Sequence, residues 1–319
     1  MRFILALALI SLAFLGCNDD NKKTEENSEI SKEAIKDAVA AVTDKKIDWQ
    51  AHRGGRGIMP ENSIAAFLTA LRYRDVSTLE LDLCVSKDDF LVVSHEPWMS
   101  SEICNDPNGK PIQKSKQQQY NIYELTYLEI AEYDCGSRRN ERFPEQKKLR
   151  VTKPRLGDVV TVVDQTCARK ELPYLNYNIE IKSTPEGDGI YHPKPADFAK
   201  LVVDQIVFLG IKKRVTVQSF DPRALQAIRN IDPTLELALL VENEEGISAN
   251  IQKLGFTPSI YSPYHELLSD AVVKDLQAQS MRVIPWTVNE VDRMKELIAM
   301  GVDGIITDYP DRIGKVIVE

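Results

Sequence analysis

The sequence has few histidines and cysteines and no excess of positive charge. Among its 319 residues there are four histidines and five cysteines, and the formal net charge is −8 at pH 7. No CxxC pair occurs, so the chain lacks the cysteine spacing of a zinc site. An acidic chain without clustered Lys and Arg is poorly suited to binding a nucleic acid backbone, so we expect no nucleic acid partner. Any phosphate that it recognises should be bound locally.

Long apolar runs are also scarce, and the one at the N-terminus extends only from Phe3 to about Leu15 after the single positive residue Arg2. It is shorter than the roughly 20 residues of a membrane-spanning helix and predicts a signal peptide over residues 1–16. Its end resembles a bacterial lipobox, which would make Cys17 the lipidated first residue of the mature protein. Residues 17–46 would then form a polar tether. These features favour a membrane lipoprotein of the cell envelope over a freely secreted protein.

The remaining cysteines are even in number, as expected for disulfides in an oxidising compartment, and they could pair in three ways. They are Cys84, Cys104, Cys135 and Cys167. We favour the pair Cys104–Cys135, because these two residues flank a polar, irregular segment that a cross-link would steady. Buried free thiols are the alternative.

From Ile47 onward, short apolar segments alternate with helical patterns, which predicts an α/β fold built from parallel βα units. Nine strand candidates compete for the eight places of a TIM (βα)8 barrel over residues 47–319: 47–52, 78–84, 90–94, 175–182, 214–219, 235–241, 259–262, 282–288 and 303–307. Because Ser86–Asp89 leaves no room for a crossover helix, one strand of the 78–94 region should form a hook or hairpin. The predicted helices are 62–74, 157–169, 196–209, 222–230, 246–254, 265–279 and 290–300.

Residues 98–155 interrupt this rhythm with a segment rich in Gln, Lys, Arg and turn residues. An insertion of this length in a barrel is usually functional or a small subdomain. It follows the third strand, so we expect it to overhang the active face. We find no internal repeat and no second independent core.

Polar side chains gather where the predicted strands end, and active sites of such barrels lie at the carboxyl ends of the strands. His52 and Arg53 end the first strand, and His95 ends the third. Strand alternation places Glu80 and Asp82 on one side of the second strand, and Glu180 and Lys182 on one side of the next. This set comprises two imidazoles, three carboxylates, an Arg and a Lys. It predicts a phosphoester-cleaving site that binds a hard metal ion.

Several runs, in order along the chain, resemble the glycerophosphodiester phosphodiesterase family. They extend from about residue 48 to 313 and comprise His52-Arg53-Gly54, Pro60-Glu61-Asn62-Ser63, Glu80-Leu81-Asp82, Val92-Val93-Ser94-His95, Tyr123-Glu124-Leu125-Thr126, Pro154-Arg155-Leu156, Glu180-Ile181-Lys182, Gln218-Ser219-Phe220-Asp221-Pro222, Trp286-Thr287-Val288-Asn289 and Gly301–Asp308. The chain departs from the family at Glu96, where members usually carry Asp.

The resemblance implies a TIM barrel with one divalent cation held by Glu80, Asp82 and Glu180. Three carboxylates independently suit Ca²⁺ or Mg²⁺. Arg53 and Lys182 would share the charge of the substrate phosphate. His52 and His95 would act as general base and acid on opposite sides of phosphorus, in an order that the sequence leaves open.

Several other residues could have either of two roles. Glu61 would bind metal or substrate, or instead fix its loop, while Trp286 and Phe220 would wall a glycerol pocket or fill the barrel mouth. Gln218 would support the site. His192 and His265 lack the context of a strand end and are interpreted as loop or surface residues.

We therefore expect a metal-dependent hydrolase that converts a small glycerophosphodiester to glycerol 3-phosphate and an alcohol. Attack by water and attack by the glycerol 2-hydroxyl through a cyclic phosphate both remain open. A phospholipase of the phosphatidylinositol-cleaving or sphingomyelinase D kind is one alternative, although the polar insertion disfavours a membrane-resident substrate. A non-catalytic, lipid-anchored phosphodiester-binding protein is the other, and the complete set of histidines and carboxylates argues against it.

Overall fold

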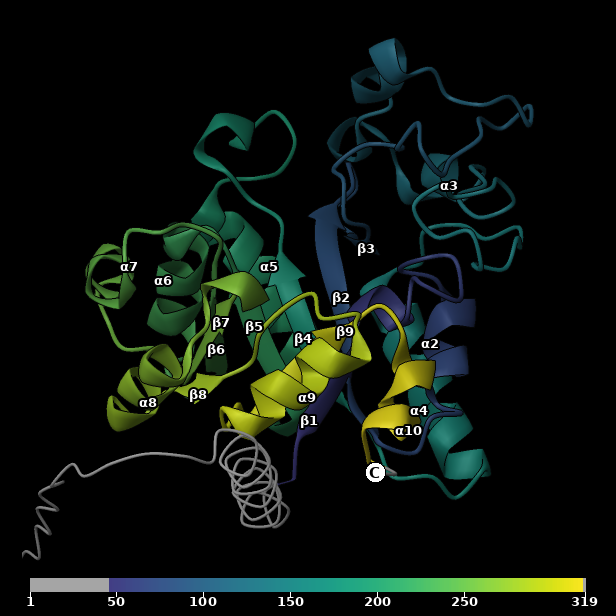
Figure 1. The fold of residues 1–319 in the computed structure, drawn as a ribbon. Helices are drawn as coiled ribbons and strands as arrows, with labels where there is room; N and C mark the ends of the chain where they lie inside the picture. Colours follow the sequence, from purple (N-terminus) through teal and green to yellow (C-terminus); the bar gives the residue numbers. More distant parts are fainter. Residues whose placement is uncertain (1–45, 318–319) are drawn as a thin grey trace, which may run out of the picture. The chain divides into compact units, whose positions relative to one another are not determined.

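A ring of parallel strands forms the centre of the computed structural model, which describes residues 46–317 (Figure 1). The signal segment 1–16, Cys17 and all but the last residue of the predicted tether lie outside the described residues. The barrel strands are β1 (Asp48–Ala51), β2 (Val76–Val85), β4 (Asn176–Ile181), β5 (Val215–Ser219), β6 (Glu236–Val241), β7 (Ile260–Pro263), β8 (Arg282–Val283) and β9 (Gly304–Thr307).

Neighbouring strands follow the order β8-β7-β6-β5-β4-β2-β1-β9, and all pairs along this path are parallel. Backbone hydrogen bonds join the two ends of the path, from Asp303 N to Val283 O (2.8 Å) and from Ile306 N to Pro285 O (3.0 Å). The predicted TIM barrel is thereby confirmed. β3 (Leu91–Val93) pairs antiparallel with β2 outside the ring, so it is the hairpin strand that the spacing required.

The helices surround the strands as expected for βα units (Figure 1). They are α2 (Ile64–Ala70), α4 (Leu156–Arg169), α5 (Pro195–Phe208), α6 (Pro222–Ile231), α7 (Ile247–Leu254), α8 (Asp270–Ala278), α9 (Val291–Ala299) and the short α10 (Ile313–Ile317). The predicted helix 265–279 is divided, because Ser269 caps α8 by accepting a hydrogen bond from Val272 N. None of the helices within residues 46–317 is long and apolar enough to cross a membrane.

The strands divide their side chains between the helices and the barrel interior. On β2, Leu79, Leu81 and Leu83 belong to the main hydrophobic core, whereas the alternate residues Glu80 and Asp82 are buried polar groups. A separate apolar cluster fills the interior along β6 to β9 with Ala238, Ile260, Ile284 and Ile306. The polar residues thus occupy the part of the interior next to β2, β4 and β5.

The insertion after β3 packs a small hydrophobic cluster against the β2–β3 hairpin, since the cluster also contains Cys84 of β2 and Val92 of β3. Met99, Ile112 and Ile122 are buried there together with other residues of the segment, which includes the short helix α3 (Tyr127–Ile130). The predicted disulfide Cys104–Cys135 is confirmed, while Cys84 and Cys167 are buried free thiols. The cross-link lets a segment without long elements keep a fixed form.

Candidate active site

The turn after β1 places two functional side chains by using unusual backbone conformations. His52 and Arg53 begin a 3-10 turn in which Arg53 has φ 51°, and Gly54 and Gly55 have φ 79° and 93°. A Cβ atom on Gly54 would lie 2.8 Å from the Cβ of Ala66, so a side chain there would collide with α2. Positive φ at a residue other than glycine marks a backbone held by its surroundings, as is common at functional sites. Here the turn aims Arg53 N at Glu80, to which it donates at 2.9 Å.

His52 is held by the last strand of the barrel. Its Nδ1 lies 2.6 Å from Oδ1 of the buried Asp308, and its Nε2 lies 3.9 Å from Oε2 of Glu80. A carboxylate only accepts hydrogen bonds, so Nδ1 carries the proton and Nε2 keeps a free lone pair. Burial lowers the pKa of His52 to about 4, with Arg56 adding to the effect and Asp308 opposing it. The imidazole is therefore neutral near pH 7.

His95 has a matching arrangement. Its Nδ1 lies 2.8 Å from Oε1 of Glu96, and the ring is partly exposed. Although burial opposes the effect, His95, Arg53 and Lys153 together lower the pKa of Glu96 to about 2. Glu96, the departure from the family pattern, thus orients the second histidine as a carboxylate.

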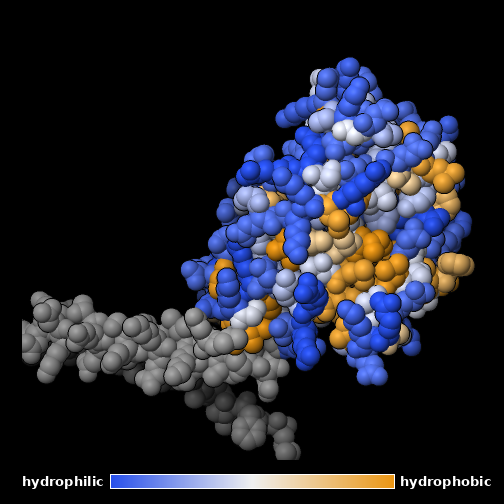
Figure 2. All heavy atoms as spheres, turned by 90° about the vertical axis from the view of Figure 1, so that its right-hand side faces the viewer, coloured by the Kyte–Doolittle hydropathy of each residue, from blue (hydrophilic) through white to orange (hydrophobic). Residues whose placement is uncertain are grey.

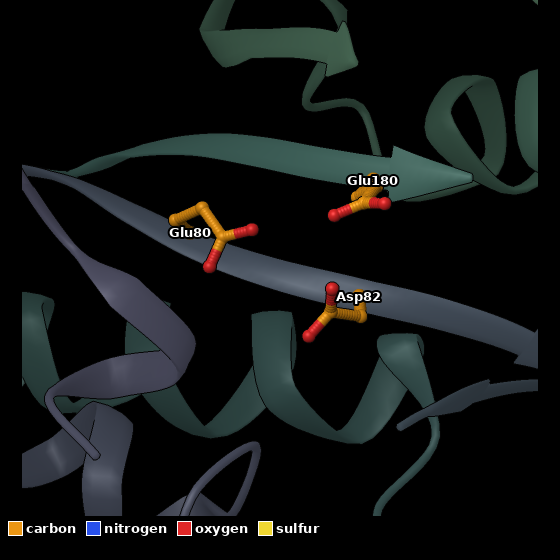
Figure 3. Close-up of side chains that lie close together, drawn as sticks. All are labelled: Glu80, Asp82 and Glu180. Carbon is orange, nitrogen blue, oxygen red and sulfur yellow. The ribbon is translucent and has the colours of Figure 1, made fainter. Parts of the chain in front are cut away.

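The three predicted metal ligands converge between β2 and β4 (Figure 3). One oxygen from each of Glu80, Asp82 and Glu180 lies within 4.8 Å of the others, and all three residues are buried. The register explains this proximity, because Asp82 on β2 is paired with Glu180 on β4. Glu80 also accepts a hydrogen bond from Gln218 Nε2 at 2.8 Å.

The electrostatics of this triad fit a bound cation. Burial and the neighbouring carboxylates raise the pKa of Glu80 well above its usual range, and burial also raises that of Glu180. Burial opposes the ionisation of Asp82, yet Arg53 and other positive groups hold its pKa well below the usual range. Within the described residues, Oδ1 of Asp82 has no hydrogen-bond partner. A divalent cation would relieve the repulsion and use this oxygen, so the triad could hold a metal ion.

Most of the positive groups around the triad are already paired with carboxylates. Arg53 contacts Glu61 at 2.9 Å and Asp82 at 3.2 Å. Lys182 donates to Glu180 at 2.8 Å. These pairs are charge-assisted and fix the donors before any ligand arrives.

Most of these groups line one cavity of about 180 Å³ at the carboxyl end of the barrel. Its lining consists of His52, Arg53, Arg56, Glu80, His95, Glu96, Arg142, Glu180, Lys182, Gln218, Phe220, Leu240, Trp286, Thr287 and Ile306. Both histidines, two of the three carboxylates and both predicted phosphate-binding cations therefore face the same space. Asp82 is fully buried and is not among the lining residues of the described chain.

The aromatic pair lies at the cavity wall. Phe220 and Trp286 pack edge to face with ring centroids 5.3 Å apart, and Trp286 is fixed by a hydrogen bond from Nε1 to Ser262 O. Glu61 is not among the lining residues of the described chain, and its Oε1 accepts a hydrogen bond from Arg53 Nη1 at 2.9 Å.

The two remaining histidines lie outside the cavity lining of the described chain. His192 belongs to a loop, where it is buried and its Nε2 accepts a hydrogen bond from Thr184 N at 3.0 Å. His265 comes two residues after β7, so it does follow a strand end, contrary to expectation. Its ring packs on Tyr264 with centroids 4.8 Å apart.

Sequence reasoning assigned no role to four residues of the site. Asp308 and Asn62 are fully buried partners of His52 and Asp82, and Arg56 donates to Asp308 Oδ1 at 2.6 Å. A signal existed for Asp308, which follows directly after a predicted strand, and for Asn62, which lies in a resembling motif. Arg142 lies in the insertion, where the sequence offered no signal for a residue of the cavity wall.

Comparisons with known proteins agree with this geometry. Residues 52–312 match the model of the glycerophosphoryl diester phosphodiesterase family. A glycerophosphodiester phosphodiesterase of Bacillus altitudinis is 30% identical over 270 residues, which is 83% of this chain and 96% of the relative. One of Bacillus subtilis (strain 168) is 27% identical and covers 83% of this chain and 85% of that protein.

Solved structures are similar over the same region. A structure from Silicibacter pomeroyi DSS-3, described as a glycerophosphoryl diester phosphodiesterase, has a TM-score of 0.76 and 26% identity, covering 86% of this chain and 94% of that one. An Oleispira antarctica phosphodiesterase in complex with the product sn-glycerol-3-phosphate shares the fold, with a TM-score of 0.65, 20% identity and coverage of 85% and 97%. The chain belongs to the glycerophosphoryl diester phosphodiesterase family and is an enzyme of that family.

Proposed function

We propose that the protein hydrolyses glycerophosphodiesters to glycerol 3-phosphate and an alcohol, with a divalent cation and two histidines. One observation carries the proposal. His52 and His95 line the same cavity, and each has Nδ1 against a carboxylate, so that Nε2 of each is left for substrate. Two oriented imidazoles flanking a phosphate are suited to in-line displacement, which requires proton removal at one apex and protonation at the other.

The reaction follows from these positions. One imidazole removes the proton from the attacking oxygen, either water or the glycerol 2-hydroxyl, as the new O–P bond forms. The other donates a proton to the oxygen of the departing alcohol as its bond to phosphorus breaks. Attack by water gives glycerol 3-phosphate directly, whereas attack by the 2-hydroxyl gives a cyclic phosphate, whose ring a water molecule then opens with the two imidazoles in exchanged roles. Arg53 and Lys182 stabilise the charge on the phosphate oxygens, Arg by its planar fork and Lys as a point charge. Gln218 holds Glu80, and Trp286 with Phe220 provides an apolar wall for the glycerol carbons.

Glu80, Asp82 and Glu180 would hold the cation, and their all-oxygen donor set favours Ca²⁺ or Mg²⁺ over zinc. When bound, such an ion supplies charge neutralisation at a phosphate oxygen and a lowered pKa for the attacking hydroxyl.

The test uses the purified protein with sn-glycero-3-phosphocholine and sn-glycero-3-phosphoethanolamine, assayed for glycerol 3-phosphate. We expect turnover with Ca²⁺ or Mg²⁺ and none after chelation. His52→Ala and His95→Ala should each abolish turnover while the protein keeps its circular dichroism spectrum. Near-normal turnover by either variant would contradict its acid–base role. Turnover that survives complete chelation would contradict the role of the cation.

The same assay addresses the alternative functions. A phospholipase would prefer intact phospholipid in vesicles, and a binding protein would turn over neither substrate. On the face shown in Figure 2, the upper part, where Figure 1 places the insertion, is mainly hydrophilic. Leu128 and Leu149 are the large apolar side chains that this fully described segment exposes. A polar insertion of this kind supports a small, water-soluble substrate.

We also propose that the protein is a lipoprotein of the cell envelope, anchored through Cys17. The short apolar N-terminal run and the lipobox-like Leu12–Cys17 support this, and so does the Cys104–Cys135 disulfide, because such bonds persist in oxidising compartments. Labelled fatty acid should be incorporated into the wild type and not into a Cys17→Ser variant. Labelling of both proteins, or of neither, would refute the anchor.

A further inference from the structure

The insertion contributes one side chain to the wall of the cavity. Arg142 lines the cavity, although it is exposed and lies at least 38 residues along the chain from every other lining residue. A cavity of about 180 Å³ is small beside typical ligand pockets of roughly 300–1,000 Å³ and would enclose only part of a diester. An exposed wall residue such as Arg142 therefore meets the part of the substrate that extends outward.

The segment that carries Arg142 is fixed to the barrel. Phe143 is buried, with its ring 6.3 Å from that of Tyr309, and the Arg56 guanidinium lies 4.9 Å from the Phe143 ring centroid. Gln146 Nε2 donates to Arg56 O at 2.6 Å. Arg142 N donates to Oδ1 of the buried Asn140, which forms the turn. The guanidinium of Arg142 is thus presented from an anchored backbone.

Arg142 differs in charge environment from the other cations of the cavity. Arg53, Arg56 and Lys182 each have a carboxylate within 3 Å. Within residues 46–317, no carboxylate lies within 4.0 Å of Arg142. Its guanidinium instead lies 5.7 Å from the centroid of the Phe143 ring. Its positive charge is therefore free to act on a ligand.

We propose that Arg142 selects among substrates by the charge of the departing alcohol, favouring an alcohol that carries an anionic group and disfavouring a cationic one. This inference rests on the proposed function. Trp286 and Phe220 follow β8 and β5, whereas Arg142 is tied to the loops after β1 and β9. We place glycerol against the aromatic wall and phosphate between the histidines, so that the other substituent of phosphorus leaves the cavity past Arg142, an exposed residue of its wall.

The test compares three diesters of glycerol 3-phosphate whose alcohols are choline, glycerol and 3-hydroxypropionate, which carry charges of +1, 0 and −1. For wild type we expect kcat/KM to rise in that order. Arg142→Gln should reduce the ratio of the anionic to the cationic substrate by about three- to tenfold, as expected for one partly solvated charge pair. Arg142→Glu should reverse the preference. Arg139→Gln is the matched control, because it removes an equal charge from an exposed neighbour paired with Glu141.

The outcomes separate the two proposals. If wild type hydrolyses none of the three diesters, the proposed function fails. If it hydrolyses them with no charge preference, or if the ratio is unchanged in both Arg142 variants, the proposed function stands and the selection by Arg142 is refuted. An equal change in Arg139→Gln would also refute it, since overall charge would then explain the preference.

Discussion

Replacing Asp308 with asparagine tests whether the orientation of His52 matters for turnover. Oδ1 of Asp308 lies 2.6 Å from both His52 Nδ1 and Arg56 Nε, and its Oδ2 accepts from Asn289 Nδ2 at 2.9 Å. Every oxygen position thus faces a donor. The NH2 group of an asparagine must oppose one of these donors, and if it donates to Nδ1 the imidazole proton moves to Nε2. His52 then presents a donor to the cavity in place of the lone pair that Nε2 has in the wild type.

The expected loss can be worked from general acid–base catalysis. A positioned acid or base contributes about 10²–10⁴ in rate, which is roughly 3–5 kcal/mol at 1.36 kcal/mol per factor of ten. We expect Asp308→Asn to reduce kcat by at least about 10² with a small change in KM. Stability should also fall by about 1.5–3 kcal/mol, because the buried Arg56 loses a charged acceptor.

Steady-state kinetics with glycerophosphocholine and urea unfolding measure the two effects separately. The matched control is Asp164→Asn, which removes a carboxylate that accepts from Tyr177 and Arg214 on the outer side of the barrel. This control should lose stability and keep its kcat. If Asp308→Asn retained kcat within about threefold of wild type, the orienting role of this carboxylate would be refuted.

Three further predictions follow from the packing and charge of the described residues. Glu180→Gln should stabilise the cation-free protein, because it removes one of three buried carboxylates that repel one another. It should also abolish the rise in melting temperature that Ca²⁺ or Mg²⁺ gives the wild type. An unchanged rise would exclude Glu180 as a ligand. Replacing Cys104 and Cys135 with serine should cost about 4 kcal/mol by chain entropy for a separation of 31 residues, measured by denaturant unfolding, and a loss below about 1 kcal/mol would contradict this. Gly54→Ala should lower the free energy of unfolding by about 2 kcal/mol or more, because the added methyl group collides with α2. Gly189→Ala is the control at φ 72°, where the methyl group meets no atom within 4 Å, and it should lower the free energy of unfolding by less. Equal losses in thermal unfolding would show that backbone strain alone is responsible.

The barrel and the reactive groups were predictable because both follow from local patterns. Period-two alternation on β2 placed Glu80 and Asp82 together, and the parallel order of the strands brought Glu180 beside them. Strand lengths were less predictable. The expected strand 282–288 is only Arg282–Val283 in the structure, because Pro285 lacks the N–H that a continuous ladder requires.

Contacts between distant segments account for what the sequence did not reveal. The pairing of His52 with Asp308 joins residues 256 positions apart, and no local pattern reports which strand-end carboxylate meets which imidazole. The insertion is a second case, because its buried residues follow neither helical nor strand periodicity and include the bonded pair Cys104–Cys135. Its docking on the barrel, and with it the place of Arg142, therefore required the structure.

The pairing of His52 with Asp308 also has a consequence for how the enzyme becomes active during its synthesis. These two residues directly follow β1 and β9, the first and last strands of the barrel along the chain, which lie side by side. A nascent polypeptide that lacks its final βα unit cannot form this pair, and it cannot close the ring by pairing β9 with β1. Hydrolytic competence should therefore arise late, when the whole domain has been made, and a chain cut short before β9 should have no activity even if its earlier units fold.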